Sequence, residues 1–110
     1  PKYNATINPK YAASLNPKHN PSVNPTKAPW SGFFVFDPDG AHLGVLARAA
    51  KGFYNFFDAD GGWSGYAASD GEGGFNLFDL EGEWIGYLRS NSDGAMNLFN
   101  VEGEWTGFTT

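Results

Sequence analysis

Residues 73–93 read GGFNLFDLEGEWIGYLRSNSD, and this stretch decides the fold because it recurs along the chain. The recurrence spans residues 31–110 as four copies of 21 residues that keep their register without a gap. The copies lie at about 31–51, 52–72, 73–93 and 94–110, and they are called units 1 to 4 here. One Phe and two Gly mark each unit most plainly: Phe36, Phe57, Phe78 and Phe99; Gly40, Gly61, Gly82 and Gly103; Gly44, Gly65, Gly86 and Gly107.

Each unit predicts one β-hairpin. A short β-prone run such as Phe75–Phe78 is followed by Asp-x-acid-Gly, a composition typical of a type I turn closed by a left-handed glycine. In unit 1 this turn contains Pro38 at its second position, where the fixed φ of proline fits. Because every connection is short, sequential strands are expected to pair antiparallel. The sequence therefore predicts an all-β meander of four hairpins, either barrel-like or solenoid-like.

Both faces of the predicted sheet carry apolar side chains. On the first strand of unit 3, Phe75 and Leu77 share one face, while Asn76 and Phe78 share the other. A sheet with one face in water alternates more cleanly, so we expect the second face to be covered by barrel closure, coiling or another element. The second repeated glycine of each unit would let a ring or a backbone lie close against the sheet. Unit 4 stops after its second strand, and an exposed edge is expected there.

Residues 1–29 form a separate arm with a period of eight residues. Asn-Pro recurs at Asn8, Asn16 and Asn24, each time after an aliphatic residue. Proline disfavours helix and central strand and pushes the preceding residue to extended geometry. We predict an extended or turn-rich arm that covers the sheet, with its aliphatic residues and Tyr rings facing one way; the alternative is a disordered tail. The candidate contact residues are Lys2, Lys10, Lys18, Tyr3 and Tyr11.

Charge is divided between the arm and the hairpin units. Residues 1–29 hold four lysines and no acid, whereas residues 30–110 hold three basic and all twelve acidic residues, so a net charge of −5 combines +4 and −9. The arm should be attracted to the units of the same or a neighbouring molecule. Acidic units repel phosphates, so no nucleic-acid partner is expected. No apolar run approaches the ~20 residues of a membrane helix, so no membrane insertion is expected.

The return strands carry a row of aromatic side chains, which are the candidate binding residues: Trp63, Trp84, Trp105, Tyr66, Tyr87 and Phe108. One interpretation is a series of stacking pockets between units, suited to sugars, choline-like cations or exposed peptide. The other is that these rings form the core, since 17 of the 19 aromatic residues lie within residues 30–110 and aliphatic residues are few. Half-buried rings would satisfy both interpretations.

Catalysis and metal binding have little support in the sequence. The acidic turns begin like a calcium loop, but they lack its further oxygen ligand before the glycine and its closing Glu, so they are interpreted as turn formers. His19 and His42 stand where other copies of their repeats carry an aromatic residue. There is no Cys to supply a thiolate ligand, and no Ser, His and acid follow a known nucleophile pattern. We expect a protein with no enzyme activity, cofactor or metal.

The run from Trp84 to Gly94, Trp-x-Gly-Tyr-Leu-x-Ser-Asn-x-x-Gly, resembles the hairpins of MORN repeats and of choline- or cell-wall-binding repeats. The arm and units together are similar to bacterial proteins with Ile-Asn-Pro-Lys-Tyr-Asn octapeptide repeats followed by hairpin repeats. That resemblance implies a bacterial origin at the cell surface or outside the cell. The expected function is a non-enzymatic repeat scaffold that binds protein or assembles with itself, as a homo-oligomer or filament. A carbohydrate or cell-wall binding module is the alternative.

Overall fold

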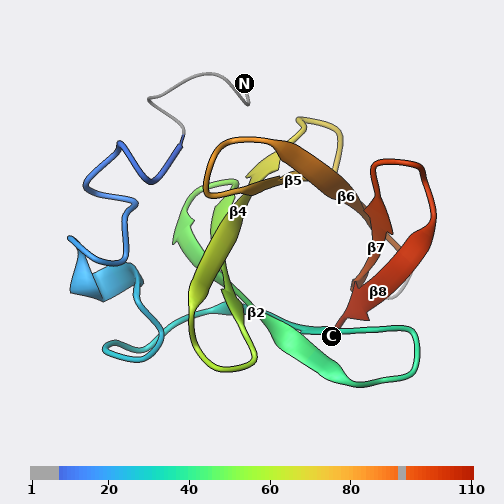
Figure 1. The fold of residues 1–110 in the computed structure, drawn as a ribbon, viewed down its shortest axis with the longest axis horizontal. Coiled ribbons are helices and arrows are strands. Elements are labelled where there is room, and N and C mark those ends of the chain that lie inside the picture. Colours follow the sequence, from blue (N-terminus) through green and yellow to red (C-terminus); the bar gives the residue numbers. More distant parts are fainter. Residues whose placement is uncertain (1–7, 92–93) are drawn as a thin grey trace.

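A computed structural model describes residues 8–91 and 94–110, and in it the four units close into one eight-stranded barrel beside the arm (Figure 1). Every strand pairs antiparallel with its neighbours in the chain, which confirms the all-β meander and makes it a barrel. No helix in this described part has the length and apolar character needed to span a membrane. The strands are β1 (Gly32–Phe36), β2 (His42–Ala50), β3 (Phe53–Asp58), β4 (Trp63–Ser69), β5 (Phe75–Asp79), β6 (Trp84–Ser90), β7 (Met96–Asn100) and β8 (Trp105–Thr109).

The expectation of an exposed edge at unit 4 is wrong, because β8 pairs with β1 and closes the barrel. The register places Val35 opposite Thr109 and Phe36 opposite Phe108. Beyond these pairs, the Thr110 N–H donates to the Phe34 carbonyl oxygen at 3.1 Å. The last strand therefore finds its hydrogen-bond partner within the same chain, and the seam removes the edge that an open meander would leave.

A β-bulge recurs at the same place in every hairpin. In unit 1, Val35 pairs with Gly44 but Phe36 pairs with His42, which leaves Leu43 as an extra residue. A bulge bends its strand and increases the local right-handed twist. We attribute the curvature that brings β8 to β1 to four such bends in one short meander. The corresponding extra residues of units 2 to 4 are Ser64, Ile85 and Thr106.

The glycine after each bulge is required by the close approach of the next strand. A Cβ added to Gly65 would lie 2.4 Å from the Phe78 carbonyl oxygen, and one added to Gly86 would lie 2.3 Å from the corresponding oxygen of Phe99. Gly107 stands in the same relation to the Phe36 carbonyl oxygen, at 2.4 Å, across the β8–β1 seam. The prediction that these glycines admit a neighbouring backbone is confirmed, and the repeat continues through the closure.

The acidic residues that open the hairpin turns bind backbone amides. Asp37 Oδ1 accepts hydrogen bonds from the N–H groups of Asp39 and Ala41, both at 2.9 Å. Gly40 closes this turn with a φ of +89°, in the left-handed region that favours glycine. The interpretation of these residues as turn formers is confirmed. The same two amide bonds recur at Asp58, Asp79 and Asn100.

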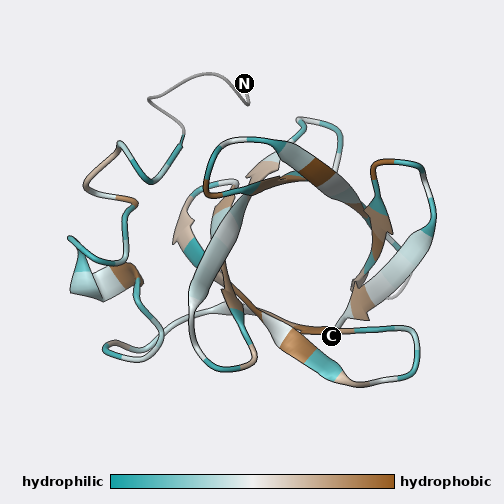
Figure 2. Ribbon diagram, in the orientation of Figure 1, coloured by the Kyte–Doolittle hydropathy of each residue, from teal (hydrophilic) through white to brown (hydrophobic). Residues whose placement is uncertain are grey.

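Apolar side chains fill the inside of the barrel, and Figure 2 shows apolar residues on strands all around it. The buried members of this cluster are Val35, Leu46, Ala67, Leu88 and Met96. On β5, Phe75 and Leu77 pack in this interior, whereas Phe78 belongs to a second cluster on the outside. A cavity of about 180 Å³ remains among the interior side chains.

The described part of the arm is a chain of turns that repeat with the eight-residue period. At Asn8, Asn16 and Asn24 the side-chain Oδ1 accepts a hydrogen bond from the N–H two residues on, at 2.8–2.9 Å. The carbonyl oxygen of each of these residues also accepts from the N–H three residues on, at 3.0 Å. Such turns suit Asn followed by Pro, since the asparagine side chain supplies the acceptor and proline has no N–H that would need one. A further Asn-Pro pair at Asn20 opens the 3-10 helix η1 (Pro21–Val23).

Candidate functional site

Pairs of aromatic rings stack on the outside of the barrel, each pair bridging two neighbouring units. The centroids of the paired rings are 5.1–5.6 Å apart and their planes are within 28° of parallel. Each pair joins the second strand of one unit to the first strand of the next unit. The rings therefore carry part of the contact between units as well as forming an outer surface. The pairs are Tyr66–Phe78, Tyr87–Phe99 and Phe108–Phe36.

The arm covers the first of these ring pairs. We call this region the covered face and define it by four rings that are 1–6% exposed: Phe53, Phe57, Tyr66 and Phe78. Leu15 of the arm packs against the cluster that Phe53, Tyr66 and Phe78 form. Phe53 also stacks on Tyr66, with centroids 5.5 Å apart. The predicted cover therefore exists, but it lies over β2 to β5 rather than over the whole sheet.

Asn55 ties the arm to the covered face. Its side chain is 0% exposed and lies beside Tyr66 in the β3–β4 register. The Asn55 Nδ2 donates to the Leu15 carbonyl oxygen at 2.8 Å, while its Oδ1 accepts from Trp63 Nε1 at 3.2 Å. Buried polar groups need such partners, so the amide fixes both the arm backbone and the indole ring. An exposed ion pair, Lys10 Nζ to Glu81 Oε1 at 3.4 Å, adds a weaker link.

The Tyr66 hydroxyl is buried under the arm and, among the described residues, lacks a hydrogen-bond partner. Burial raises the pKa of Tyr66 above its ordinary value, and the negative charge of Asp79 raises it further. Leaving a buried hydroxyl unpaired costs about 1–3 kcal/mol. The ring of Tyr66 therefore contributes packing, while its hydroxyl group opposes burial.

Units 3 and 4 carry corresponding rings that the arm does not cover. We call this region the open face and define it by Trp84, Tyr87, Phe99 and Trp105. Trp84 is 39% exposed and stacks on Tyr87, while Trp105 is 50% exposed and lies opposite Phe99 in the β7–β8 register. The positions of Asn55 are occupied here by Asn76, beside Tyr87, and Asn97, beside Phe108.

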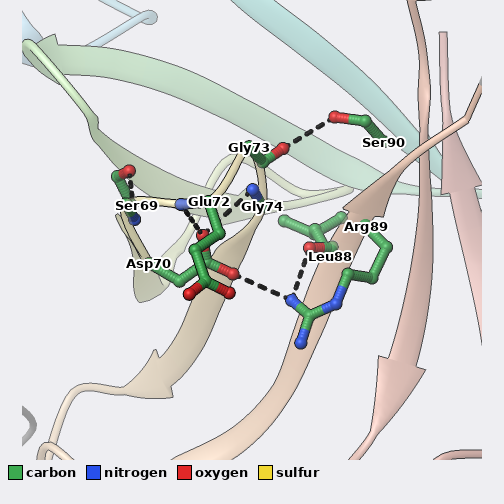
Figure 3. Close-up of polar contacts among 9 residues, drawn as sticks. Ser69, Asp70, Glu72, Gly73, Gly74, Leu88, Arg89 and Ser90 are labelled. Atoms are coloured by element: carbon green, nitrogen blue, oxygen red, sulfur yellow. Dashed lines mark hydrogen bonds and ion pairs between the residues drawn. The ribbon is translucent and has the colours of Figure 1, made fainter.

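An arginine already rests on the open face. The Cζ atom of Arg89 lies 4.7 Å from the centroid of the Tyr87 ring. The Arg89 Nη1 donates to Asp70 Oδ2 at 2.9 Å (Figure 3). Asp70 is held in place because its Oδ1 accepts from the N–H groups of Glu72 and Gly74. The hydrogen bond from Glu72 lowers the pKa of Asp70, and Gly74 and Arg89 contribute in the same direction. One ring of this face, Tyr87, thus accepts a cation.

Four exposed carboxylates lie in the turns before β6 and β8, the strands that begin with Trp84 and Trp105: Glu81, which pairs with Lys10 of the arm, and Glu83, Glu102 and Glu104. Unit 2 has Asp60 and Gly62 at the corresponding positions, so it carries one such acid where units 3 and 4 carry two each. The open face therefore combines exposed rings with an acidic rim, a combination suited to basic ligands.

The structure separates the predicted ring residues into two environments. Tyr66 is buried, and Trp63 is partly buried and donates a hydrogen bond to Asn55. In contrast, Trp84 and Trp105 are exposed. Tyr87 and Phe108 are half-buried. The predicted row therefore contains core positions and surface positions. No separate role was predicted for Asn55, although the asparagines in register at 55, 76 and 97 were the available signal.

The predicted arm contacts have mixed outcomes. Lys10 reaches Glu81, while Lys18 is exposed. The Tyr11 side chain is 67% exposed, and the Lys10 ammonium lies 5.8 Å from the centroid of its ring. The expectation that Tyr rings face the same way as the aliphatic residues is therefore wrong at Tyr11, because local turn geometry points it to solvent. Lys2 and Tyr3 lie outside the described residues.

His42 packs as an aromatic ring, with centroids 6.1 Å from Phe34 and 5.7 Å from Phe36, at the position that Trp63 holds in unit 2. Within residues 8–91 and 94–110, no group of three or more His, Cys, Asp or Glu side chains is arranged to hold a metal ion. The chain matches no protein-family model, no curated protein and no solved structure.

Proposed function

We propose that this chain is a non-enzymatic repeat scaffold that binds polypeptide through the rings on the outside of its barrel. One observation carries the proposal: the Tyr66–Phe78 pair is buried under a polypeptide segment, and the equivalent open face presents the same kinds of group to solvent. On the covered face an Asn side chain binds the segment's backbone, which requires no particular side chain of the ligand. Asn76 and Asn97 stand at the same register positions.

The chemistry of the open face favours a basic polypeptide. Exposed tryptophans commonly anchor protein interfaces, and Arg is their frequent partner. The four flanking glutamates would speed the encounter with a basic ligand and exclude an acidic one. We also propose a structural or adhesive role at a bacterial surface, and this part of the proposal is supported by the sequence resemblance alone.

Selection from a displayed peptide library tests the proposal. The full chain should enrich peptides rich in Lys and Arg, and the double variant Trp84→Ala/Trp105→Ala should lose them. Because both side chains are at least 39% exposed, the double variant should keep the circular dichroism spectrum of the parent. A selection that enriches nothing, or peptides that bind the double variant equally well, would contradict the proposal.

Carbohydrate binding is a second candidate, favoured by the stacked and exposed Trp84–Tyr87 pair. A sugar ring can lie on such a surface while neighbouring carboxylates, such as Glu83, accept its hydroxyl hydrogens. A glycan array with the parent chain and the single variant Trp84→Ala separates the candidates. Glycan binding that requires Trp84, without peptide enrichment, would replace the first proposal with this one.

A further inference from the structure

The docked arm has an outer side, and that side is basic. Lys10, Lys18, His19 and Lys27 are all exposed while the arm lies on its own barrel, and residues 8–28 contain no acid. Tyr11 projects among them with 67% of its side chain exposed. The arm therefore presents lysines and a tyrosine ring to solvent without leaving the covered face.

The open face adjoins the covered face at β6, where Trp84 lies opposite Phe78, and it extends from there to β8. Figure 1 shows the arm alongside β4, with β7 and β8 across the barrel from it. The open face carries the complementary chemistry, since exposed Trp84 and Trp105 stand among exposed Glu83, Glu102 and Glu104. The Arg89–Tyr87 contact gives the geometry of a cation on these rings.

We propose that the open face of one copy of this chain binds the outer side of the docked arm of a second copy. This inference rests on the proposed function and names its ligand. Lysine ammonium groups would lie among the glutamates and over the indole rings, and Tyr11 would pack beside Trp84 or Trp105. Neither arm has to leave its own barrel, so every copy can offer both surfaces at once.

This contact joins two different surfaces of the molecule. It is therefore heterologous, and repeated contacts generate a filament unless the rotation between copies closes a ring. Contact between two open faces is disfavoured, because it would bring eight glutamates together. The charge division between arm and units is explained by the same contact.

Analytical ultracentrifugation of the full chain and two double variants tests the assembly. Trp84→Ser/Trp105→Ser damages the open face, and Lys18→Gln/Lys27→Gln damages the outer side of the arm. The parent chain should form larger species as its concentration rises, and more weakly at about 0.5 M than at about 0.05 M salt. Each variant alone should associate at least about tenfold more weakly. An equimolar mixture should form heterodimers and stop there, because it contains one intact pair of surfaces.

Phe34→Ser is the matched control, since Phe34 is 48% exposed but lies outside the open face. This control should assemble like the parent chain, and circular dichroism should show that all variants are folded. A parent chain that stays monomeric at every concentration overturns the inference, and so does dimerisation of the arm variant by itself through two open faces. If the parent is monomeric but its open face still enriches basic peptides, the self-assembly inference fails and the proposed function stands.

Discussion

The covered face and the open face are built from the same repeat but have opposite surroundings. Both contain a Tyr–Phe ring pair, a Trp and an Asn at equivalent positions. They differ beside the ring pair, where unit 2 has Phe53 and Ala68 and unit 3 has Gly74 and Arg89. Phe53 adds a surface for Leu15 and Ala68 leaves room for it, whereas Gly74 adds no ring and Arg89 lies over Tyr87. Two positions per unit thus give the two ring pairs different surroundings.

Replacing the tyrosine of each face should give the largest difference in stability between the covered face and the open face. Tyr66→Ala should destabilise the chain by about 4 kcal/mol, because it removes a buried ring that contacts Phe53 and Phe78. Tyr87→Ala should cost about 1–2 kcal/mol, since that ring is half-buried and the surrounding groups can relax into solvent. Urea unfolding followed by tryptophan fluorescence measures both. Equal losses of stability in the two variants would show that the arm contributes little to the stability of the covered face.

The repeated glycines should behave alike in covered and open units, because the barrel itself imposes their requirement. Gly65→Ala and Gly86→Ala should each cost about 3 kcal/mol, as the added methyl would overlap a carbonyl oxygen of the next strand. Gly71→Ala is the control, with a φ of +80° and no atom within 4 Å of the new methyl, and should cost about 1–2 kcal/mol. Thermal unfolding ranks the three variants. A mild effect at either strand glycine would contradict the close approach.

Replacing Asn55 of the covered face and Asn76 of the open face should also affect stability unequally, but the difference should be smaller than for the tyrosines. Asn55→Ala should cost about 2 kcal/mol, because it leaves the Leu15 carbonyl and the Trp63 N–H without their partner. Asn76→Ala should change stability by less than about 0.5 kcal/mol, as expected at a half-exposed position. Hydrogen exchange of the arm amides should accelerate only in the Asn55 variant. Acceleration in both variants would mean that the arm is held by something other than this bond.

The smallest expected effect concerns alkaline pH. Below a pH of about 10, Tyr66 is protonated in both the folded and the unfolded chain and contributes no pH dependence. Because its pKa is raised in the folded state, ionisation of the unfolded chain at higher pH lowers the free energy of unfolding. Tyr66→Phe should lose this part of the alkaline decline and be slightly more stable at neutral pH, since it removes an unpaired hydroxyl. Unfolding curves at several pH values compare the two chains, and identical slopes would contradict the raised pKa.

Hairpins, turns and strand faces could be predicted from the sequence, because each depends on residues close together in the chain. Asp37 and Gly40 define a turn by themselves, and alternation along a strand separates Leu77 from Phe78. The sequence left open whether the meander closes into a barrel or forms a solenoid, since that choice depends on the sum of four bulges along the whole meander. Tyr11 was misplaced for a related reason: a period of eight residues aligns positions in the sequence, while the turns between them set the direction of each side chain.

Four repeats, a basic arm and acidic units are properties of the sequence by itself, and they determined the all-β class and the attraction between the two parts. Only the tertiary structure decided that unit 2 receives the arm and that units 3 and 4 keep exposed rings. The physical reason is that the choice depends on contacts between residues far apart in the chain, from Leu15 to the Phe53 cluster and from Asn55 to the arm backbone. The closure of the barrel also matters, because it places β7 and β8 across from the arm (Figure 1).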